Sequence, residues 1–219
     1  MSSLYKIDRL RLITYKGQKQ KVIKDLRCRY LAKSQFVKCN AQSKKNIYVN
    51  FRGSHFKKVS FDGAELFGCD FWGTSFNNCS FRNTKISDCV FMACKFKTCD
   101  FTGAVFNFTT IVNTGLEECK KMDISKGINL YKQYPQSQIS VELQEVLELL
   151  KSNINIRKNK LLHLSGNKHN ELNLFLLQHR YSLAELPQLL IQLNVRSTKN
   201  ITTYKKLELE LKKIKNMVK

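Results

Sequence analysis

The sequence predicts a mainly β protein in which a solenoid of short strands is followed by an α-helical C-terminal region. Two observations support this prediction. Twelve of the 14 phenylalanines lie between Phe51 and Phe108, most of them five residues apart. After Leu116 this spacing stops, and apolar residues recur at the three- and four-residue intervals that are typical of helices.

The repeat of five runs without a gap through fourteen large apolar residues, ten of which are phenylalanine: Phe51, Phe56, Phe61, Leu66, Phe71, Phe76, Phe81, Ile86, Phe91, Phe96, Phe101, Phe106, Ile111 and Leu116. A period of five would spread these side chains around a helix and would alternate them between the faces of a flat strand. Small or modest residues lie two positions before each of them, and Gly or Asn often lies two positions after. Because Gly and Asn tolerate turn conformations, the pattern predicts a turn after each short extended piece, with every large side chain facing one axis.

This pattern resembles the pentapeptide-repeat family, whose motif is small, any, large apolar, any, any. The resemblance covers residues 49–118, with weaker traces at Leu26, Leu31 and Phe36. Ala41 and Asn46 depart from the motif and are expected to mark a loop or bulge. The resemblance implies a right-handed quadrilateral β-helix with four pentapeptides per coil. Residues twenty apart would then stack, as in the column Phe51, Phe71, Phe91 and Ile111.

The charges divide the chain into three predicted regions. The chain has 38 Lys and Arg against 17 Asp and Glu, a net charge of +21. Residues 1–48, a basic N-terminal cap with an irregular first coil, have a net charge of +11, and residues 49–118, the β-helix, have none. Residues 119–219, a basic helical region, have a net charge of +10. This excess is more than solubility requires and indicates an anionic macromolecular partner, either nucleic acid or a nucleoprotein.

Two groups of basic residues are the candidates for binding a polyanion. The first lies in the N-terminal segment, which reads as two extended pieces around a turn, and the second lies in the last predicted helix. The candidates are Arg9, Arg11, Lys16, Lys19, Lys21, Lys24, Arg27, Arg29, Lys205, Lys206, Lys212 and Lys213.

Four helices are expected after residue 139. The first is capped by Ser140 and runs to about Lys151, with Val141, Val146, Leu147 and Leu150 facing inward. The second spans 171–179, and Ser182 with Glu185 forms a capping box for the third. The last, near 202–218, has an apolar stripe that could dock on the solenoid, pair with a second copy of the chain or receive a partner helix; docking is the expected use.

Several apolar residues lie next to large inward residues in the sequence and are predicted to point outward from the coils. They form a candidate contact patch of Phe67, Trp72, Val90, Met92 and Val112. Exposed apolar patches often mark contacts with a partner. Cover by the C-terminal helices is the alternative that the sequence leaves open.

No residue pattern predicts catalysis, a cofactor or a metal. Five of the eight cysteines occupy the small inward position of the repeat, and the chain has no Cys-x-x-Cys, so buried free thiols are expected. The spacings of His163, His169 and His179 match no metal motif. Free thiols, no secretory signal and no apolar stretch of about 20 residues predict a protein of the reducing cytoplasm that enters no membrane.

The sequence therefore predicts a non-enzymatic binding or scaffold protein, in which a rigid β-helix with basic flanks engages the anionic partner. A first alternative is topoisomerase protection that confers drug or toxin resistance. The chain resembles the quinolone-resistance and gyrase-interacting members at the level of the fold, but those look like acidic DNA mimics and this chain is basic. A second alternative is a homo-oligomeric scaffold with protein partners only. An enzyme with its site in the C-terminal helices is disfavoured by the absence of a visible nucleophile and base pair.

Overall fold

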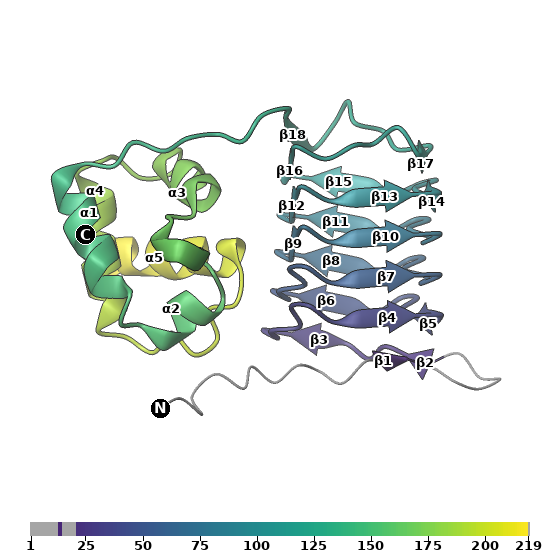
Figure 1. Cartoon of the computed structure of the whole chain (residues 1–219), viewed down its shortest axis with the longest axis horizontal. Coiled ribbons are helices and arrows are strands. Elements are labelled where there is room, and N and C mark those ends of the chain that lie inside the picture. The colour runs from purple at the N-terminus through teal and green to yellow at the C-terminus, as the bar shows by residue number, and fades with distance from the viewer. Residues whose placement is uncertain (1–12, 15–20, 219) are drawn as a thin grey trace. The chain divides into compact units, whose positions relative to one another are not determined.

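The computed structural model describes residues 13–14 and 21–218 (Figure 1). The chain divides into two compact units, of which the first ends at Lys132 and the second begins at Gln133. The first unit contains the strands and the second contains the helices.

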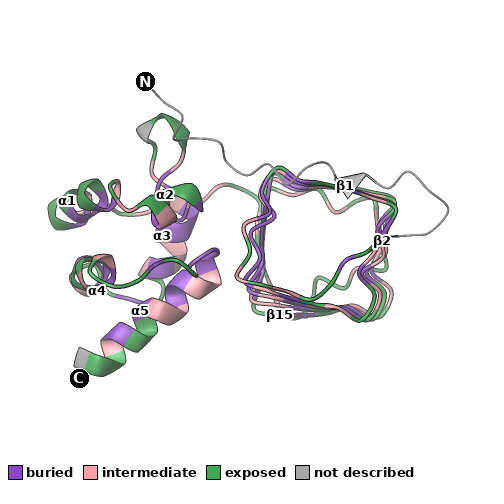
Figure 2. Cartoon of the chain, turned by 90° about the horizontal axis from the view of Figure 1, so that it is seen from below, coloured by how far each residue is buried: buried purple, intermediate pink, exposed green. Residues whose placement is uncertain are grey.

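The first unit is a β-solenoid with four sides, and its square outline is visible in Figure 2. Its described strands pair in parallel, each hydrogen-bonded to its counterpart one coil away. One side consists of β1 (Ile13–Thr14), β4 (Gln35–Val37), β7 (His55–Lys57), β10 (Ser75–Asn77) and β13 (Lys95–Lys97). A second side consists of β3 (Leu26–Arg27), β6 (Lys45–Ile47), β8 (Glu65–Phe67), β11 (Lys85–Ser87) and β15 (Val105–Asn107).

The other two sides differ in the length of their strands. The strands of one side have three or four residues, and those of the other have two. One consists of β9 (Asp70–Trp72), β12 (Val90–Met92), β16 (Thr109–Val112) and β18 (Ile128–Tyr131). The other has the two-residue pairs β2 (Lys21–Val22) with β5 (Cys39–Asn40) and β14 (Cys99–Asp100) with β17 (Cys119–Lys120). Single bridges such as Ser60 with Ser80 connect these pairs.

The predicted columns of phenylalanine are confirmed. Phe56, Phe76 and Phe96 are partners in successive strands, and the ring centroid of Phe76 lies 5.1 Å from that of Phe56 and 4.9 Å from that of Phe96. The rings within a column are nearly parallel, at 9° and 7° for these two pairs. Rings of neighbouring columns meet edge to face, as Phe76 and Phe81 do at 71°. Both arrangements are favourable for aromatic quadrupoles, so the phenylalanines fill the interior as one continuous core.

The small residue two positions before a large one bonds the backbone at the corner of the coil at most of the positions where it is Ser, Thr or Cys. The hydroxyls of Thr74 and Thr84 donate hydrogen bonds to the carbonyls of Phe51 and Phe61, at 3.0 and 2.8 Å. The thiols of Cys79 and Cys89 point at the equivalent carbonyls of Phe56 and Leu66. The position therefore selects side chains that are small enough for the interior, and most of those with a hydroxyl or thiol also bond a buried carbonyl.

The turn predicted after each large residue is also confirmed. The residue two positions later has a positive φ on nearly every side, for example +64° at Gly53 and +54° at Asn83. Lysine takes the same conformation at Lys38 and Lys58, with φ of 51° and 54°. Gly and Asn recur here because a β-carbon is disfavoured in this left-handed region, whereas the coil geometry requires it at every corner.

The solenoid is longer and more regular than its sequence motif. Ala41 and Asn46 are buried at interior positions of ordinary coils, so the expected loop or bulge at residues 41–46 is wrong. At the other end, β18 pairs with β16 and takes the unit to Lys132, whereas the sequence pattern ends at residue 118. Hydrogen bonds between backbones hold these coils, and the backbone pairs whether or not the side chain matches the motif.

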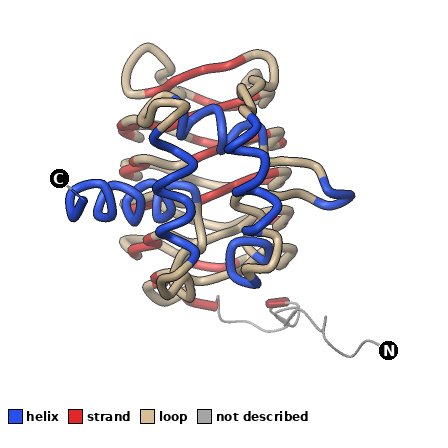
Figure 3. Tube along the Cα trace, turned by 90° about the vertical axis from the view of Figure 1, so that its left-hand side faces the viewer, coloured by secondary structure: helices blue, strands red, loops and turns tan. Residues whose placement is uncertain are grey.

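The second unit is helical (Figure 3), with α1 (Val141–Leu150), α2 (Ile154–Lys158), α3 (Glu171–Gln178), α4 (Glu185–Asn194) and α5 (Tyr204–Val218). The four predicted helices are confirmed, including the cap in which the Ser140 hydroxyl accepts from the Leu143 amide at 3.2 Å. The expectation that Val141 faces inward is wrong, because its side chain is 72% exposed and Leu143 is buried instead. The short α2 lacks the several turns that periodicity needs, and the sequence pattern did not predict it.

The core of this unit is leucine-rich and involves every helix. Leu143, Leu147, Leu177, Leu190 and Leu211 are among its fully or almost fully buried residues. No helix in the described part of the chain is both long and apolar enough to span a membrane.

Candidate functional site

The N-terminal candidates for polyanion binding lie around the first described coil rather than on one surface. Lys21 lies on β2, and Arg27 lies on β3, on a different side of the solenoid. Lys24 and Arg29 are exposed in the connections. The guanidinium of Arg27 lies 5.8 Å from the centre of the Tyr48 ring. Arg9, Arg11, Lys16 and Lys19 lie outside the described residues.

The C-terminal candidates lie on α5, where nearby carboxylates neutralise most of them. Lys205 forms an ion pair of 2.6 Å with Glu208, and Lys206 forms one of 2.7 Å with Glu210. Lys213 also contacts Glu210, at 3.0 Å. Lys212 is exposed. Helix α5 therefore presents a weaker positive field than its number of lysines indicates.

A group of lysines that the sequence analysis missed shares one side of the β-helix. On the side formed by β4, β7, β10 and β13, the residues that flank each buried phenylalanine point outward. Positions 35–38, 55–58, 75–78 and 95–98 contain no acidic residue. We call this the lysine face, and it consists of the exposed residues Lys38, His55, Lys57, Lys58, Lys95 and Lys97. The spacing of twenty residues is the signal that could have revealed the lysine face, because it places Lys57, Asn77 and Lys97 in one column.

Three of the five candidate apolar residues form a column, as the spacing of twenty predicts. Trp72, Met92 and Val112 are direct partners in β9, β12 and β16, and Val90 lies on β12. The guanidinium carbon of Arg52 lies 3.9 Å from the centre of the Trp72 ring, a cation–π contact. Phe67 ends β8 on a neighbouring side, where its ring meets Tyr48 with centroids 5.5 Å apart. Trp72, Val90 and Val112 are buried, and Phe67 and Met92 are half-buried, so these residues do not form the exposed patch that the sequence predicts. Their role in contacting a partner stays a prediction.

The cysteines are free and most are buried. Cys69 and Cys89 are stacked neighbours, and so are Cys79 and Cys99. Burial raises the pKa of Cys94 to about 12 and, together with nearby negative groups, the pKa of Cys119 to about 12. The thiols of Cys94 and Cys119 therefore stay protonated near neutral pH, which makes these two residues poor nucleophiles and poor metal ligands.

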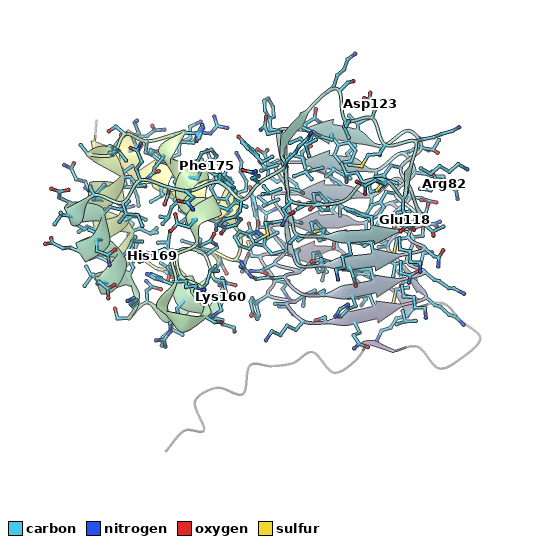
Figure 4. All side chains as sticks on the ribbon, turned by 45° about the horizontal axis from the view of Figure 1, so that its top comes forward. Arg82, Glu118, Asp123, Lys160, His169 and Phe175 are labelled. Carbon is cyan, nitrogen blue, oxygen red and sulfur yellow. The ribbon has the colours of Figure 1, made fainter. Side chains whose placement is uncertain are left out.

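The helical unit has one pair of neighbouring histidines. The Nε2 of the buried His163 lies 2.9 Å from the Leu147 carbonyl, and the His169 ring lies 5.9 Å from the His163 ring. His169 bonds the side chain of Gln144 at 3.1 Å (labelled in Figure 4). Among the described residues, no group of three or more His, Cys, Asp or Glu is placed to hold a metal ion.

A pocket of about 400 Å³ lies in the same unit, lined by Gln136, Gln138, Phe175, Gln178, His179, Tyr181, Ser182 and Leu183. The Tyr181 hydroxyl donates to the Glu208 carbonyl at 3.0 Å, and burial raises the pKa of Tyr181 to about 12. The Ser182 hydroxyl accepts from the Glu185 amide at the start of α4. Three glutamines are part of a lining that is mostly apolar, and its two hydroxyls serve the local fold.

Comparison with known proteins identifies the repeat. Residues 47–83 match the family description "Pentapeptide repeats", in eight copies. No curated protein matches the chain. Residues 47–83 lie inside the solenoid, so the resemblance predicted from the spacing of five is confirmed.

Solved structures similar to this chain include three pentapeptide-repeat proteins. A trypsin-treated form of QnrB1, described as a plasmid-mediated fluoroquinolone resistance protein, has 18% identity and a TM-score of 0.29, over 46% of this chain and 57% of that chain. A protein of the Arabidopsis thaliana thylakoid lumen has 14% identity and a TM-score of 0.26, over 70% and 88% of the two chains. Rfr23 of the cyanobacterium Cyanothece 51142 has 11% identity and a TM-score of 0.26, over 49% and 89%. The match spans little more than half of the QnrB1 chain.

Proposed function

The first unit of this chain is a pentapeptide-repeat β-helix, and on that premise we propose that the protein is a non-enzymatic binding or scaffold protein for an anionic macromolecule, either nucleic acid or a nucleoprotein complex. In this proposal the β-helix is a rigid frame, and the basic residues of the coils and of α5 make the contacts.

The charge of the coils is the observation that supports this proposal most directly. Residues 21–132 contain 19 Lys and Arg against nine Asp and Glu, a net charge of +10. The basic residues between positions 21 and 48, which the sequence pattern assigned to a basic N-terminal cap with an irregular first coil, lie in coils of the same stack. One continuous frame therefore presents +10 of the chain's net charge of +21, which favours a large polyanion over a small ligand.

The frame itself is suited to binding without rearrangement. Its interior is a continuous stack of buried aromatic rings, and each coil bonds to the next through backbone amides. A preorganised surface loses little conformational entropy when it binds, so more of the electrostatic attraction appears as affinity.

A salt series of binding to duplex DNA, single-stranded DNA and structured RNA tests this proposal. We expect at least one of the three to stay bound at about 0.15 M salt. If binding to all three nucleic acids is lost at that salt concentration, the attraction is a general one for phosphate groups, and the proposal is contradicted.

A variant with Lys21, Lys24, Arg27 and Arg29 changed to Gln tests the contribution of the N-terminal candidates. We expect it to bind more weakly and with a smaller salt dependence, by roughly one unit of log–log slope for each phosphate that the variant no longer neutralises. The matched control changes Lys151, Arg157, Lys158 and Lys168 of the helical unit to Gln, which removes the same charge. Equal weakening by both variants would show that net charge matters and that position does not.

Among the described residues, no contact favours topoisomerase protection or assembly with a second copy of the chain. Both alternatives stay predictions. Light scattering tests the second directly, because a homo-oligomeric scaffold would have a mass that is a multiple of 25.5 kDa.

A further inference from the structure

We propose that the lysine face binds the phosphate backbone of a double-stranded nucleic acid without reading its sequence. This inference rests on the proposed function and assigns it to one side of the β-helix. It differs from the sequence prediction, which placed the contacts in the two basic ends of the chain.

The fold gathers these lysines from distant parts of the sequence. Register places Lys57, Asn77 and Lys97 in one outward column, and His55, Ser75 and Lys95 in the next. Lys38 and Lys58 follow β4 and β7 at the corner of the coil, both with positive φ. Figure 1 shows β4, β7, β10 and β13 stacked one above another on this side. Lys57, Lys95 and Lys97 thus share one flat side, and Lys38 and Lys58 lie at its edge.

The spacing of the lysines suits an extended polyanion. Alternate residues of a strand lie about 7 Å apart, and strands two coils apart are separated by about 10 Å. Both lengths are close to the Debye length of about 8 Å at physiological salt, so the fields of neighbouring lysines reinforce one another. A linear array of phosphates can therefore interact with several of them at once.

The opposite side of the square has the same geometry but alternates its charges. Lys45, Glu65 and Lys85 are direct partners in β6, β8 and β11. The Lys45 ammonium lies 3.5 Å from the Glu65 carboxylate. On the lysine face, by contrast, Asn77 and Ser75 occupy the places between the basic residues. Within the described part of the chain, no ion pair involves a lysine of this face, so its charge is not neutralised locally.

The chemistry of the face favours a duplex over a single strand. Its outward residues in β4, β7, β10 and β13 include no Phe, Tyr or Trp, and stacking on such rings is the usual way to bind unpaired bases. The one imidazole among them, His55, is held by a bond of 2.6 Å between its Nδ1 and the Ser75 hydroxyl. The face also has no arginine to form bidentate contacts with guanine. Lysine ammonium groups are suited to the phosphates that line the outside of a duplex, and these contacts carry no sequence information.

The test compares two triple variants of the full chain, using a fluorescent duplex DNA of about 24 base pairs and a scrambled duplex of equal length. The first variant has Lys57→Gln, Lys95→Gln and Lys97→Gln. The control has Lys45→Gln, Lys85→Gln and Lys120→Gln, which removes the same charge from other sides of the coils. All six side chains are exposed, and circular dichroism with a urea titration verifies that both variants fold.

We expect the first variant to bind both duplexes at least about tenfold more weakly than the wild-type chain. The slope of log affinity against log salt concentration should become shallower by about 2.7, or about 0.9 for each lysine removed. The affinity of the control variant should change by less than about threefold. Equal weakening of both variants would overturn the assignment to this face. So would a preference of the wild-type chain for one of the two duplexes, since it would require contacts with base edges.

Two further outcomes separate this inference from the proposed function. If the wild-type chain binds the duplex and only the variant of Lys21, Lys24, Arg27 and Arg29 loses affinity, the lysine face is excluded and the proposed function stands. If the wild-type chain binds no nucleic acid at physiological salt, both are excluded. A competition experiment adds a third outcome. If polyglutamate displaces the labelled duplex as well as unlabelled duplex of the same total charge does, the face attracts any acidic chain, and its assignment to nucleic acid is overturned.

Discussion

At the scale of single residues, the position of a phenylalanine decides what it contributes to stability. Phe76 is fully buried between Phe56 and Phe96, whereas Phe108 is 73% exposed at a corner of the coil. The two residues thus provide a matched comparison within one unit.

We expect Phe76→Ala to lower the free energy of unfolding by about 3–5 kcal/mol, because it removes a ring from a stack that has little room to collapse. Phe108→Ala should change it by less than about 0.5 kcal/mol. Urea unfolding followed by circular dichroism measures both. Similar losses for the two variants would contradict the description of the stacked core.

Asn46 is a residue whose side chain conflicts with its surroundings. It is 1% exposed, and neither polar atom of its amide has a hydrogen-bond partner. Its neighbours in the column are Leu26 and Leu66. No hydrogen bond therefore compensates for removing this amide from water, and Asn46 lowers the stability of the fold relative to an apolar residue.

We expect Asn46→Leu to raise the free energy of unfolding by about 1–2 kcal/mol, because an apolar side chain replaces an unpaired polar one. Thr84→Val is the contrasting variant. It removes the hydroxyl that donates to the Phe61 carbonyl, and it should cost about 1 kcal/mol. Thermal unfolding measures whether each variant raises or lowers the stability. Destabilisation by Asn46→Leu would show that the Asn46 amide does have a hydrogen-bond partner in solution.

At the scale of elements, the helical unit contains a buried histidine that responds to pH. His163 is buried, and its Nε2 bonds the carbonyl of Leu147 at the end of α1. Its Nδ1 has no hydrogen-bond partner. Burial is the largest cause that lowers the pKa of His163, and the charges of His169 and Lys151 lower it further. The hydrogen bond to the Leu147 carbonyl and the charge of Glu148 raise this pKa and partly offset the lowering.

The sign of the pH dependence follows from this lowered pKa. The unfolded chain takes up a proton at His163 near pH 6.5, whereas the folded chain does so only at lower pH. We expect the stability of the helical unit to be constant above about pH 7 and to fall by up to about 1.4 kcal/mol per unit as the pH drops below about 6.5. His163→Gln should flatten this slope in urea titrations at several pH values. The matched control, His179→Gln, changes an exposed histidine and should leave the slope in place.

At the scale of the whole molecule, the chain consists of two units with separate cores. The first is built from stacked phenylalanines, and the second from leucines contributed by its helices. A core substitution should therefore act on the unit that contains it.

We expect Phe76→Ala to lower the midpoint at which the β-helix unfolds and Leu147→Ala to lower the midpoint at which the helices unfold, each by several degrees. Near-ultraviolet and far-ultraviolet circular dichroism follow the two units in one thermal experiment. A single transition that both variants shift equally would show that the units unfold together.

Local patterns in the sequence are enough to predict the repeat, the aromatic columns and the corners of the coils. A period of five with large apolar residues is compatible with no helix or flat strand, and the left-handed corners explain Gly53 and Asn83. The helices from Ser140 onward could be predicted as well, since caps and apolar periodicity are local signals. The coils at Ala41, Asn46 and β18 could not, because backbone hydrogen bonds hold them without help from the motif.

The surface that each charge occupies, by contrast, depends on how the coils stack. Lys57 and Lys97 are forty positions apart, and the sequence assigns both to a segment without net charge. Stacking in register places them on one side of the coils, while it places Glu65 between Lys45 and Lys85 on the opposite side. Charge summed along a chain is a local count, whereas the field that a partner meets depends on which residues the fold brings to the same face.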